Sequence, residues 1–416
     1  MIRSTKVSIK FANKNKRDTL TQIIDEYRRV VSFFIDFLWS LEKVPVLVPK
    51  NITDKCDTWL SARMKQCASK QASCIVRGTQ VKQRKRLYTI QKMLEDNRLE
   101  EAKKLQKIYD SNLITKPVVD DLEMELSSQI VSKVDMQNNT QFDGWITLTS
   151  IGNKIKLILP FKKTKHFNRL LNRGGVLTSG VRLSKRGATF MVNMPDVPSV
   201  SEGTTIGIDI GQSSCISVSN GQVVECDPHG HTYMSICKEL ARKKKGSKAF
   251  SRKQKHRENF IHYCVNQINF DGVKNMRIEK IRHLRTSVRT SRLLSGWSYK
   301  EVFDALRGKV ETLGVQVTEL SPTYTSQRCS KCGRVRKANR NGKIYKCDYC
   351  GLTMDADINA AINISLPLPE IPKEVRLKGL NKTGFFWDLS GVSLDCHEPI
   401  VRDALKTNLM ANYNVC

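Results

Sequence analysis

The chain has 416 residues, of which 40% are hydrophobic, which is enough apolar material for roughly two to four folded domains. No apolar stretch approaches the ~20 residues that a membrane-spanning helix needs, and the first ten residues do not resemble a signal peptide, so we expect a cytoplasmic protein. Lysines and arginines number 70 against 40 acidic residues, and the formal net charge of +30 indicates a polyanionic partner. A membrane surface is the competing partner, but the basic residues are spread over the whole chain and do not form one amphipathic helix, so nucleic acid is expected.

The first half of the chain alternates between two periodicities. Residues 4–12 alternate apolar and polar side chains, which predicts a strand with one buried face. From Asp18 the apolar residues recur at three and four residue steps, and we expect mostly helix through about Lys133. Between Trp145 and Asp196 the period returns to two, which predicts several strands in a small sheet or β-barrel. We expect residues 4–12 to pair with these strands, so that the helical block is an insertion into one β domain.

The second half begins after a polar, proline-rich linker at Pro195–Gly203. The segments TTIGIDIG, CISVS and QVVEC predict a three-stranded meander of the kind that begins RNase H-like folds. The remaining predicted elements are a basic helix at 232–265, a strand at 273–281, a polar connector, a helix at 299–313, a strand at 315–320, a cysteine-rich insert and a short helix from Ala356. The 50 residues after Ser365 show no strong periodicity, and the sequence assigns them no role.

Three acidic residues have positions that suit catalysis. Asp209 ends an apolar strand between two glycines, Glu279 lies in a probable strand, and Asp357 opens a helix of small residues. Each also has a simpler interpretation: Asp209 could cap a turn, Glu279 could lie on the surface, and either Asp355 or Asp357 could cap the helix. Two strand acids and one acid at a helix start, in this order, can converge on one point of an RNase H-like sheet. Two Mg²⁺ ions bridged by such carboxylates can activate water and stabilise a leaving phosphate oxygen.

The cysteines fall into two groups. Nine have no paired spacing and are interpreted as reduced thiols: Cys56, Cys67, Cys74, Cys215, Cys226, Cys237, Cys264, Cys396 and Cys416. The other four, Cys329, Cys332, Cys347 and Cys350, form two C-x2-C pairs separated by fourteen residues. This spacing predicts one closed, structural Zn²⁺ site rather than four unconnected thiols.

A dense basic run lies between two of the predicted nuclease strands. Its candidate nucleic-acid-binding residues are Arg242, Lys243, Lys244, Lys245, Lys248, Arg252, Lys253, Lys255 and Arg257. Such residues neutralise phosphates without specifying a base sequence. The alternative is a solvated face, which is what most charge runs are.

Together these motifs resemble the transposon-encoded TnpB proteins and the miniature type V CRISPR effectors. GIDIG resembles the first RuvC motif of that family, RIEKI the second and DADINAAINI the third. RKKKGSK with RENFIHY resembles the family's basic helix, and SPTYTSQRCSKCG the segment leading into its zinc ribbon. Carried over by position, the resemblance assigns catalysis and Mg²⁺ binding to Asp209, Glu279 and Asp357.

The resemblance also implies a domain layout. It gives an α+β multidomain protein with a β-barrel wedge domain (1–17 and 140–198) that is interrupted by a helical recognition domain (18–139). A RuvC-like nuclease domain follows (203–320 and 355–366), with a zinc ribbon inserted at 321–354 and a tail at 367–416. The order of motifs does not distinguish a transposon protein from a CRISPR effector, and it does not distinguish a monomer from a homodimer.

The function implied by the resemblance is RNA-guided endonuclease activity on double-stranded DNA next to a short flanking motif, in a prokaryotic or mobile-element setting. The partners would be a guide RNA, which supplies sequence specificity by base pairing, and the target DNA. Two alternatives stay open. One is a guided DNA-binding repressor that does not cut, and the other is an unguided nuclease or transposase with the same fold.

Overall fold

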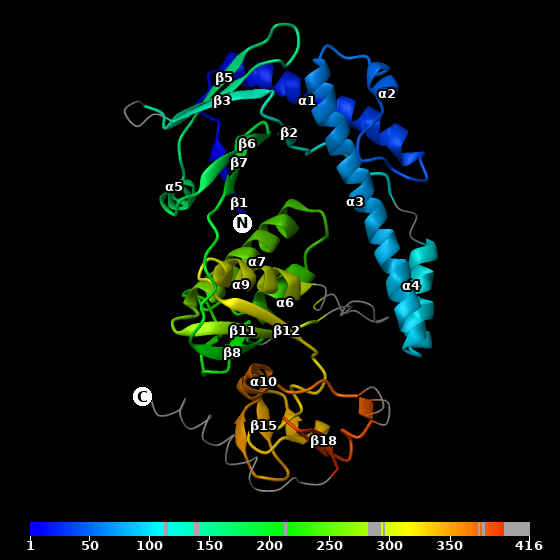
Figure 1. Cartoon of the computed structure of the whole chain (residues 1–416), viewed down its shortest axis with the longest axis vertical. Helices are drawn as coiled ribbons and strands as arrows, with labels where there is room; N and C mark the ends of the chain where they lie inside the picture. The colour runs from blue at the N-terminus through cyan, green and yellow to red at the C-terminus, as the bar shows by residue number, and fades with distance from the viewer. Residues whose placement is uncertain are drawn as a thin grey trace. The chain divides into compact units, whose positions relative to one another are not determined.

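The computed structural model describes residues 1–111, 115–136, 141–211, 214–281, 293, 296–372, 375–376 and 379–394. The chain divides into two compact units, Met1–Asp196 and Val197–Cys416, and the division falls inside the proline-rich segment predicted as a linker (Figure 1). Most of the predicted polar connector before residue 299 lies outside the described residues, as do Cys396, Cys416 and the end of the tail. Within the described ranges, no helix has the length and apolarity that a membrane span requires.

The β-structure of the first unit forms two open sheets. The four-stranded antiparallel sheet has the order β1 (Ile2–Ser8), β7 (Gly187–Asn193), β6 (Val176–Leu183) and β2 (Met124–Leu126). The three-stranded sheet has the order β3 (Val131–Met136), β4 (Gly144–Leu148) and β5 (Leu157–Phe161). The pairing of the first strand with a late strand is confirmed, since Thr5 lies opposite Phe190. The predicted barrel is wrong, because the strands of the described residues do not close into one sheet.

The helices of this unit are α1 (Lys14–Trp39), α2 (Lys50–Asp54), α3 (Ala62–Glu95), α4 (Leu99–Ser111) and α5 (Lys165–Asn172). Helix α1 begins where the Asn13 side chain accepts the Lys16 N–H, and its apolar stripe is buried against α3 and the sheets. Helix was predicted as far as Lys133, but residues 124–136 form β2 and β3. The reason is visible in β2, where Met124 and Leu126 are buried and the residue between them is exposed, which is the alternation of a strand.

The second unit is built on a five-stranded sheet of order β10-β9-β8-β11-β12. Its strands are β8 (Thr204–Asp209), β9 (Ile216–Val218), β10 (Val223–Val224), β11 (Val273–Glu279) and β12 (Gln316–Leu320). The meander β8-β9-β10 is antiparallel, as predicted, whereas β8, β11 and β12 run parallel.

The helices of the second unit are α6 (Tyr233–Ala241), α7 (Lys248–Gln267), α9 (Tyr299–Glu311) and α10 (Ala356–Ser365). The single basic helix predicted at 232–265 is therefore two helices. The chain turns at Gly246, whose φ of 82° suits glycine, and Ser247 caps α7 by accepting the Phe250 N–H.

Helix α10 packs directly on β8. Gly207 makes this possible, because a Cβ at that position would collide with the carbonyl oxygen of Ala361 and the backbone nitrogen of Ser365. The close approach brings the first turn of α10 to the end of β8, where Asp209 lies.

The cysteine-rich insert and the tail contain two small sheets, of which the second has strands from both segments. One contains β14 (Arg340–Asn341), β15 (Ile344–Lys346) and β16 (Thr353–Asp355), and the other contains β13 (Arg334–Val335), β17 (Phe385–Asp388) and β18 (Gly391–Ser393). Val335 of the insert is buried together with Ile371, Phe385 and Trp387 of the tail. The tail, to which the sequence assigned no role, completes the hydrophobic core beside the insert.

Candidate active site

The three predicted catalytic carboxylates line one cavity of about 540 Å³. Strands β8 and β11 are parallel neighbours with Ile208 opposite Ile278, so Asp209 and Glu279 follow at the same edge of the sheet. Asp357 comes to this edge from the first turn of α10. Residues separated by 148 positions in the sequence are thus brought to one point by the parallel pairing and by the glycine contact of β8 with α10.

The helix start separates the roles of two neighbouring acids. Asp355 is the N-cap of α10, and its Oδ1 accepts the backbone N–H groups of Asp357 (2.8 Å) and Ile358 (3.0 Å). The capping interpretation therefore applies to Asp355. This leaves the Asp357 carboxylate for the cavity, where it is 3% exposed.

The electrostatics of the cavity favour a cation. Burial, and then the nearby carboxylates of Glu279 and Asp357, raise the pKa of Asp209 to about 8. Burial also raises the pKa of Glu279, against hydrogen bonding by Thr325. Asp357 Oδ2 is buried and has no hydrogen-bond partner among the described residues. An unpartnered carboxylate oxygen and mutually repelling acids are the donor set that Mg²⁺ requires, so these residues fit the ion.

Two neighbouring side chains that the sequence did not place in the site hold the carboxylates. The Arg340 Nη2 donates to Asp357 Oδ1 at 2.7 Å, and the Thr325 hydroxyl donates to Glu279 Oε1. Both residues line the cavity. The sequence around Arg340 carries no signal for its contact with Asp357, because only the folded insert brings β14 to α10.

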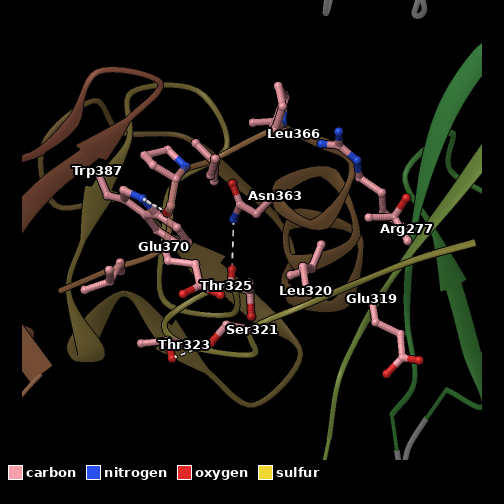
Figure 2. Close-up of a pocket in the computed structure, with 15 residues that line it drawn as sticks. Arg277, Glu319, Leu320, Ser321, Thr323, Thr325, Asn363, Leu366, Glu370 and Trp387 are labelled. Atoms are coloured by element: carbon pink, nitrogen blue, oxygen red, sulfur yellow. Dashed lines mark hydrogen bonds between the residues drawn. The ribbon is translucent and has the colours of Figure 1, made fainter. Parts of the chain in front are cut away.

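Thr325 also lines a second cavity of about 330 Å³ (Figure 2). There the Asn363 Nδ2 of α10 donates to the backbone oxygens of Thr325 (2.9 Å) and Arg328 (2.7 Å). Asn363 Oδ1 in turn accepts from the buried Arg328 guanidinium at 2.7 Å. Helix α10 therefore supplies Asp357 to the site from its first turn and fixes the backbone of Thr325 from its last turn.

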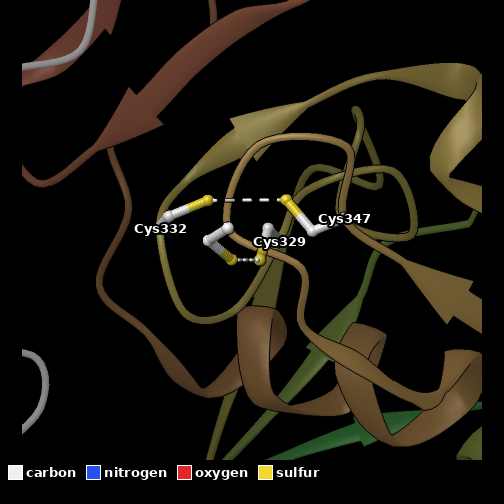
Figure 3. A group of neighbouring side chains, drawn as sticks. Cys329, Cys332 and Cys347 are labelled. Carbon is white, nitrogen blue, oxygen red and sulfur yellow. Dashed lines mark hydrogen bonds between the residues drawn. The ribbon is translucent and has the colours of Figure 1, made fainter.

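The four paired cysteines converge as predicted (Figure 3). All four sulfur atoms lie within 4.8 Å of one another, and the Cys329–Cys350 and Cys332–Cys347 pairs are each 3.6 Å apart. A tetrahedral ion with Zn–S bonds of about 2.3 Å separates its sulfur ligands by about 3.8 Å. The cluster therefore fits one Zn²⁺ with four thiolate ligands.

Known proteins match the part of the chain that contains the four cysteines and Asp357. The family model described as "Cas12f1-like, TNB domain" matches residues 299–364, which include the four cysteines, Thr325, Arg340 and Asp357. The CRISPR-associated endodeoxyribonuclease Cas12f1 of Sulfoacidibacillus thermotolerans is 37% identical over 109 residues, 26% of this chain and 25% of that protein. InsQ of Escherichia coli K12, named for an inferred RNA-guided DNA endonuclease activity, is 27% identical over 206 residues, 42% of this chain and 50% of InsQ.

The chain is thus similar to Cas12f1 and to InsQ over part of its length. Its matches span a quarter to a half of the length of the two named relatives. Among solved structures, a Cas12f1–sgRNA–target DNA complex aligns with 88% of this chain and 99% of that chain, at a TM-score of 0.45 and 14% identity.

The basic run of this chain divides into exposed and buried residues. The exposed candidates are Arg242, Lys243, Lys244, Lys245, Lys248, Arg252 and Lys255. Lys253 is partly buried and pairs with Glu239. Arg257 is 6% exposed and donates to both carboxylate oxygens of Glu301 (3.1 and 2.6 Å) and to the Gly296 carbonyl. The Arg257 guanidinium is thus committed inside the unit, and the structure removes it from the set that could reach a phosphate.

Proposed function

We propose that this chain is an RNA-guided endonuclease that hydrolyses phosphodiester bonds of double-stranded DNA next to a short flanking motif. The observation that carries the proposal is the convergence of Asp209, Glu279 and Asp357 on one cavity, with an unpartnered buried oxygen on Asp357. The relatives support the same chemistry, since one is named an endodeoxyribonuclease and another is named for guided DNA cleavage.

Each carboxylate would act as a ligand for divalent ions, which when bound supply an activated water and charge stabilisation of the leaving oxygen. The rest of the chain's contribution is positioning. Thr325 fixes one oxygen of Glu279, and Arg340 fixes one oxygen of Asp357, so the other oxygens face the cavity. Asp355 holds the start of α10 by its two capping bonds.

Arg340 also offers a positive charge where a scissile phosphate would lie. Its side chain is 30% exposed beside the buried Asp357, so it can reach the cavity while remaining paired. Lys343 lies on the same hairpin and lines the same cavity, but its ammonium is bound to Ser214 (2.7 Å) and Glu225 (3.0 Å). We assign phosphate orientation to Arg340 and a structural role to Lys343.

We further propose that the first unit and the exposed lysines at the start of α7 bind the guide RNA and the DNA duplex. The net charge of +30 provides a sequence-independent attraction for phosphates, while pairing between guide and target supplies the specificity. In this proposal the wedge and recognition domains correspond to the first unit, and the nuclease domain with its zinc ribbon corresponds to the second.

The test is to express the chain together with its flanking genomic DNA, extract the RNA that copurifies and challenge the complex with a plasmid library of randomised flanks and Mg²⁺. We expect cleavage that depends on a match to the guide, on one flanking motif and on Asp209. The matched control is Asp271→Ala, which removes an exposed acid of the same unit that does not line the cavity.

The other outcomes are distinct. RNA-dependent binding without cleavage by the wild-type chain would indicate a guided repressor. Cleavage without bound RNA would indicate an unguided nuclease, and absence of both bound RNA and cleavage would overturn the proposal.

A further inference from the structure

A third group of metal-ligating side chains lies in the second unit, outside the carboxylate cavity and the cysteine cluster. It consists of Asp227, His231 and His256, whose ligand atoms all lie within 4.8 Å of one another. None of the three lines the 540 Å³ cavity. A ligand bound here would not depend on the nuclease function.

The turn that carries two of these residues is fixed by its own hydrogen bonds. Asp227 Oδ1 accepts the backbone N–H groups of His229 and His231, both at 2.9 Å. The Asp227 N–H donates to the His231 carbonyl at 3.0 Å, and Cys226 pairs with Thr232 as an isolated β-bridge. The Asp227 carboxylate and the His231 ring are therefore presented from a closed turn, whose shape does not depend on an ion.

The third residue comes from a different element. His256 lies on α7, and its ring meets that of His231 edge to face, with 4.8 Å between the centroids and an angle of 81°. All three side chains are partly buried, so the site is open to solvent on one side. The turn supplies one carboxylate and one imidazole, and α7 supplies a second imidazole. Together they give three potential ligands for one metal ion.

We propose that Asp227, His231 and His256 bind one divalent transition-metal ion of the zinc class. Two imidazoles with one carboxylate are a recurrent ligand set for such ions, and Mg²⁺ is disfavoured because it prefers oxygen ligands. A tetrahedral ion with bonds of about 2.1 Å places its ligands about 3.4 Å apart, so small side-chain rotations would close the site. Solvent fills the remaining coordination positions, and the ion fastens the 226–232 turn to α7.

Lys253 competes with the ion for His256. Its ammonium nitrogen lies 3.1 Å from Nδ1 of that ring and is also paired with Glu239. An ion on His256 repels the ammonium, which keeps Glu239 as its partner. Removing the lysine charge is therefore expected to tighten the binding of the metal.

The experiment uses the full chain with one zinc per molecule already in the cysteine cluster, in buffer with saturating Mg²⁺. Zn²⁺ is titrated by calorimetry, and Co²⁺ by absorption, where ligation without thiolate gives no sulfur-to-metal charge-transfer band. We expect one further ion per chain, at least about tenfold weaker binding in His231→Ala and His256→Ala, and unchanged binding in His262→Ala, an exposed histidine of the same helix.

Lys253→Gln provides a test that does not depend on loss of a ligand, and the expected result is tighter binding than in the wild type. The ion is also expected to raise the melting temperature of the wild type but not of His231→Ala. Absence of a further ion in the wild type, or equal binding by the wild type and both alanine variants at the ligand positions, would overturn the proposal.

Discussion

The carboxylates and the cysteines are two clusters of the second unit, and they depend on the fold in opposite ways. Asp209 and Glu279 lie at the ends of strands, and Asp357 lies at the start of a helix, in a domain with a large hydrophobic core. That domain holds the three acids together although they repel one another. The cysteines stand on two short turns with little apolar material around them, chiefly Tyr345 and Ala356. In the sheet domain the fold assembles the acidic side chains, whereas around the cysteines we expect a bound metal to assemble the fold.

The strongest way to test this contrast is to remove one zinc ligand. Cys347→Ser is expected to release the zinc and unfold the ribbon, because a structural zinc in isolated fingers contributes about 10–16 kcal/mol of apparent binding free energy. Metal content and limited proteolysis between residues 321 and 355 measure the effect. Cys74→Ser, at an exposed cysteine of the first unit, is the matched control and should change neither. A zinc-free but protease-resistant ribbon would contradict the assignment.

Removing one carboxylate ligand should leave the fold intact and abolish DNA cleavage. Asp209→Asn removes one shared ligand, and we expect cleavage to fall at least about a thousandfold, about 4 kcal/mol in barrier. Guide RNA and DNA binding should remain, and they are measured by filter binding beside the cleavage assay. Wild-type cleavage rates in this variant would remove Asp209 from the site.

The pH dependence of stability sharpens the contrast. The pKa of Asp209 is raised from 3.8 to about 8, so between about pH 4 and pH 8 the folded, Mg²⁺-free unit holds a proton that the unfolded chain has lost. The stabilisation from this proton is complete below about pH 4 and is lost as the pH rises through about 8. In Mg²⁺-free buffer the melting temperature of the second unit should therefore fall over this window. In Asp209→Asn the slope should be smaller, and equal slopes in the two proteins would refute the raised pKa of Asp209.

The smallest expected effect is on a positioning residue. Thr325→Val keeps the shape of the buried side chain but removes the hydrogen bond to Glu279, and about a tenfold loss of cleavage is expected, about 1.4 kcal/mol. Thr323→Val, whose hydroxyl contacts Ser321 instead, is the control. A loss as large as that of Asp209→Asn would mean that Thr325 is more than a positioning residue.

The sequence predicted those features that are set by residues within one short segment of the chain. The C-x2-C spacing predicted a cluster that the structure assembles, and the alternation around Asp209 and Glu279 predicted β8 and β11. Contacts made between elements were not visible. The pairing of Arg340 with Asp357 and the cluster of His231 with His256 depend on how turns meet helices, for which periodicity carries no signal.

Two predicted elements are wrong because the spacing of the apolar residues does not mark where these elements end. The strands at 124–136 are short, and the apolar steps before them continue the helical pattern, so the change of period was missed. The break between α6 and α7 is set by Gly246 inside a basic run, where no apolar residues mark the period. The role of the tail was missed because its apolar residues pack against the insert and not against one another.

The most direct test of the central claim is to count Mn²⁺ ions by electron paramagnetic resonance in the full chain and in Asp209→Asn, Glu279→Gln and Asp357→Asn, each with its zinc content measured in parallel. The account predicts that every substitution lowers Mn²⁺ binding while zinc stays at the wild-type level, because the three carboxylates form one site that the fold assembles without metal. Mn²⁺ binding equal to wild type in all three variants would contradict it.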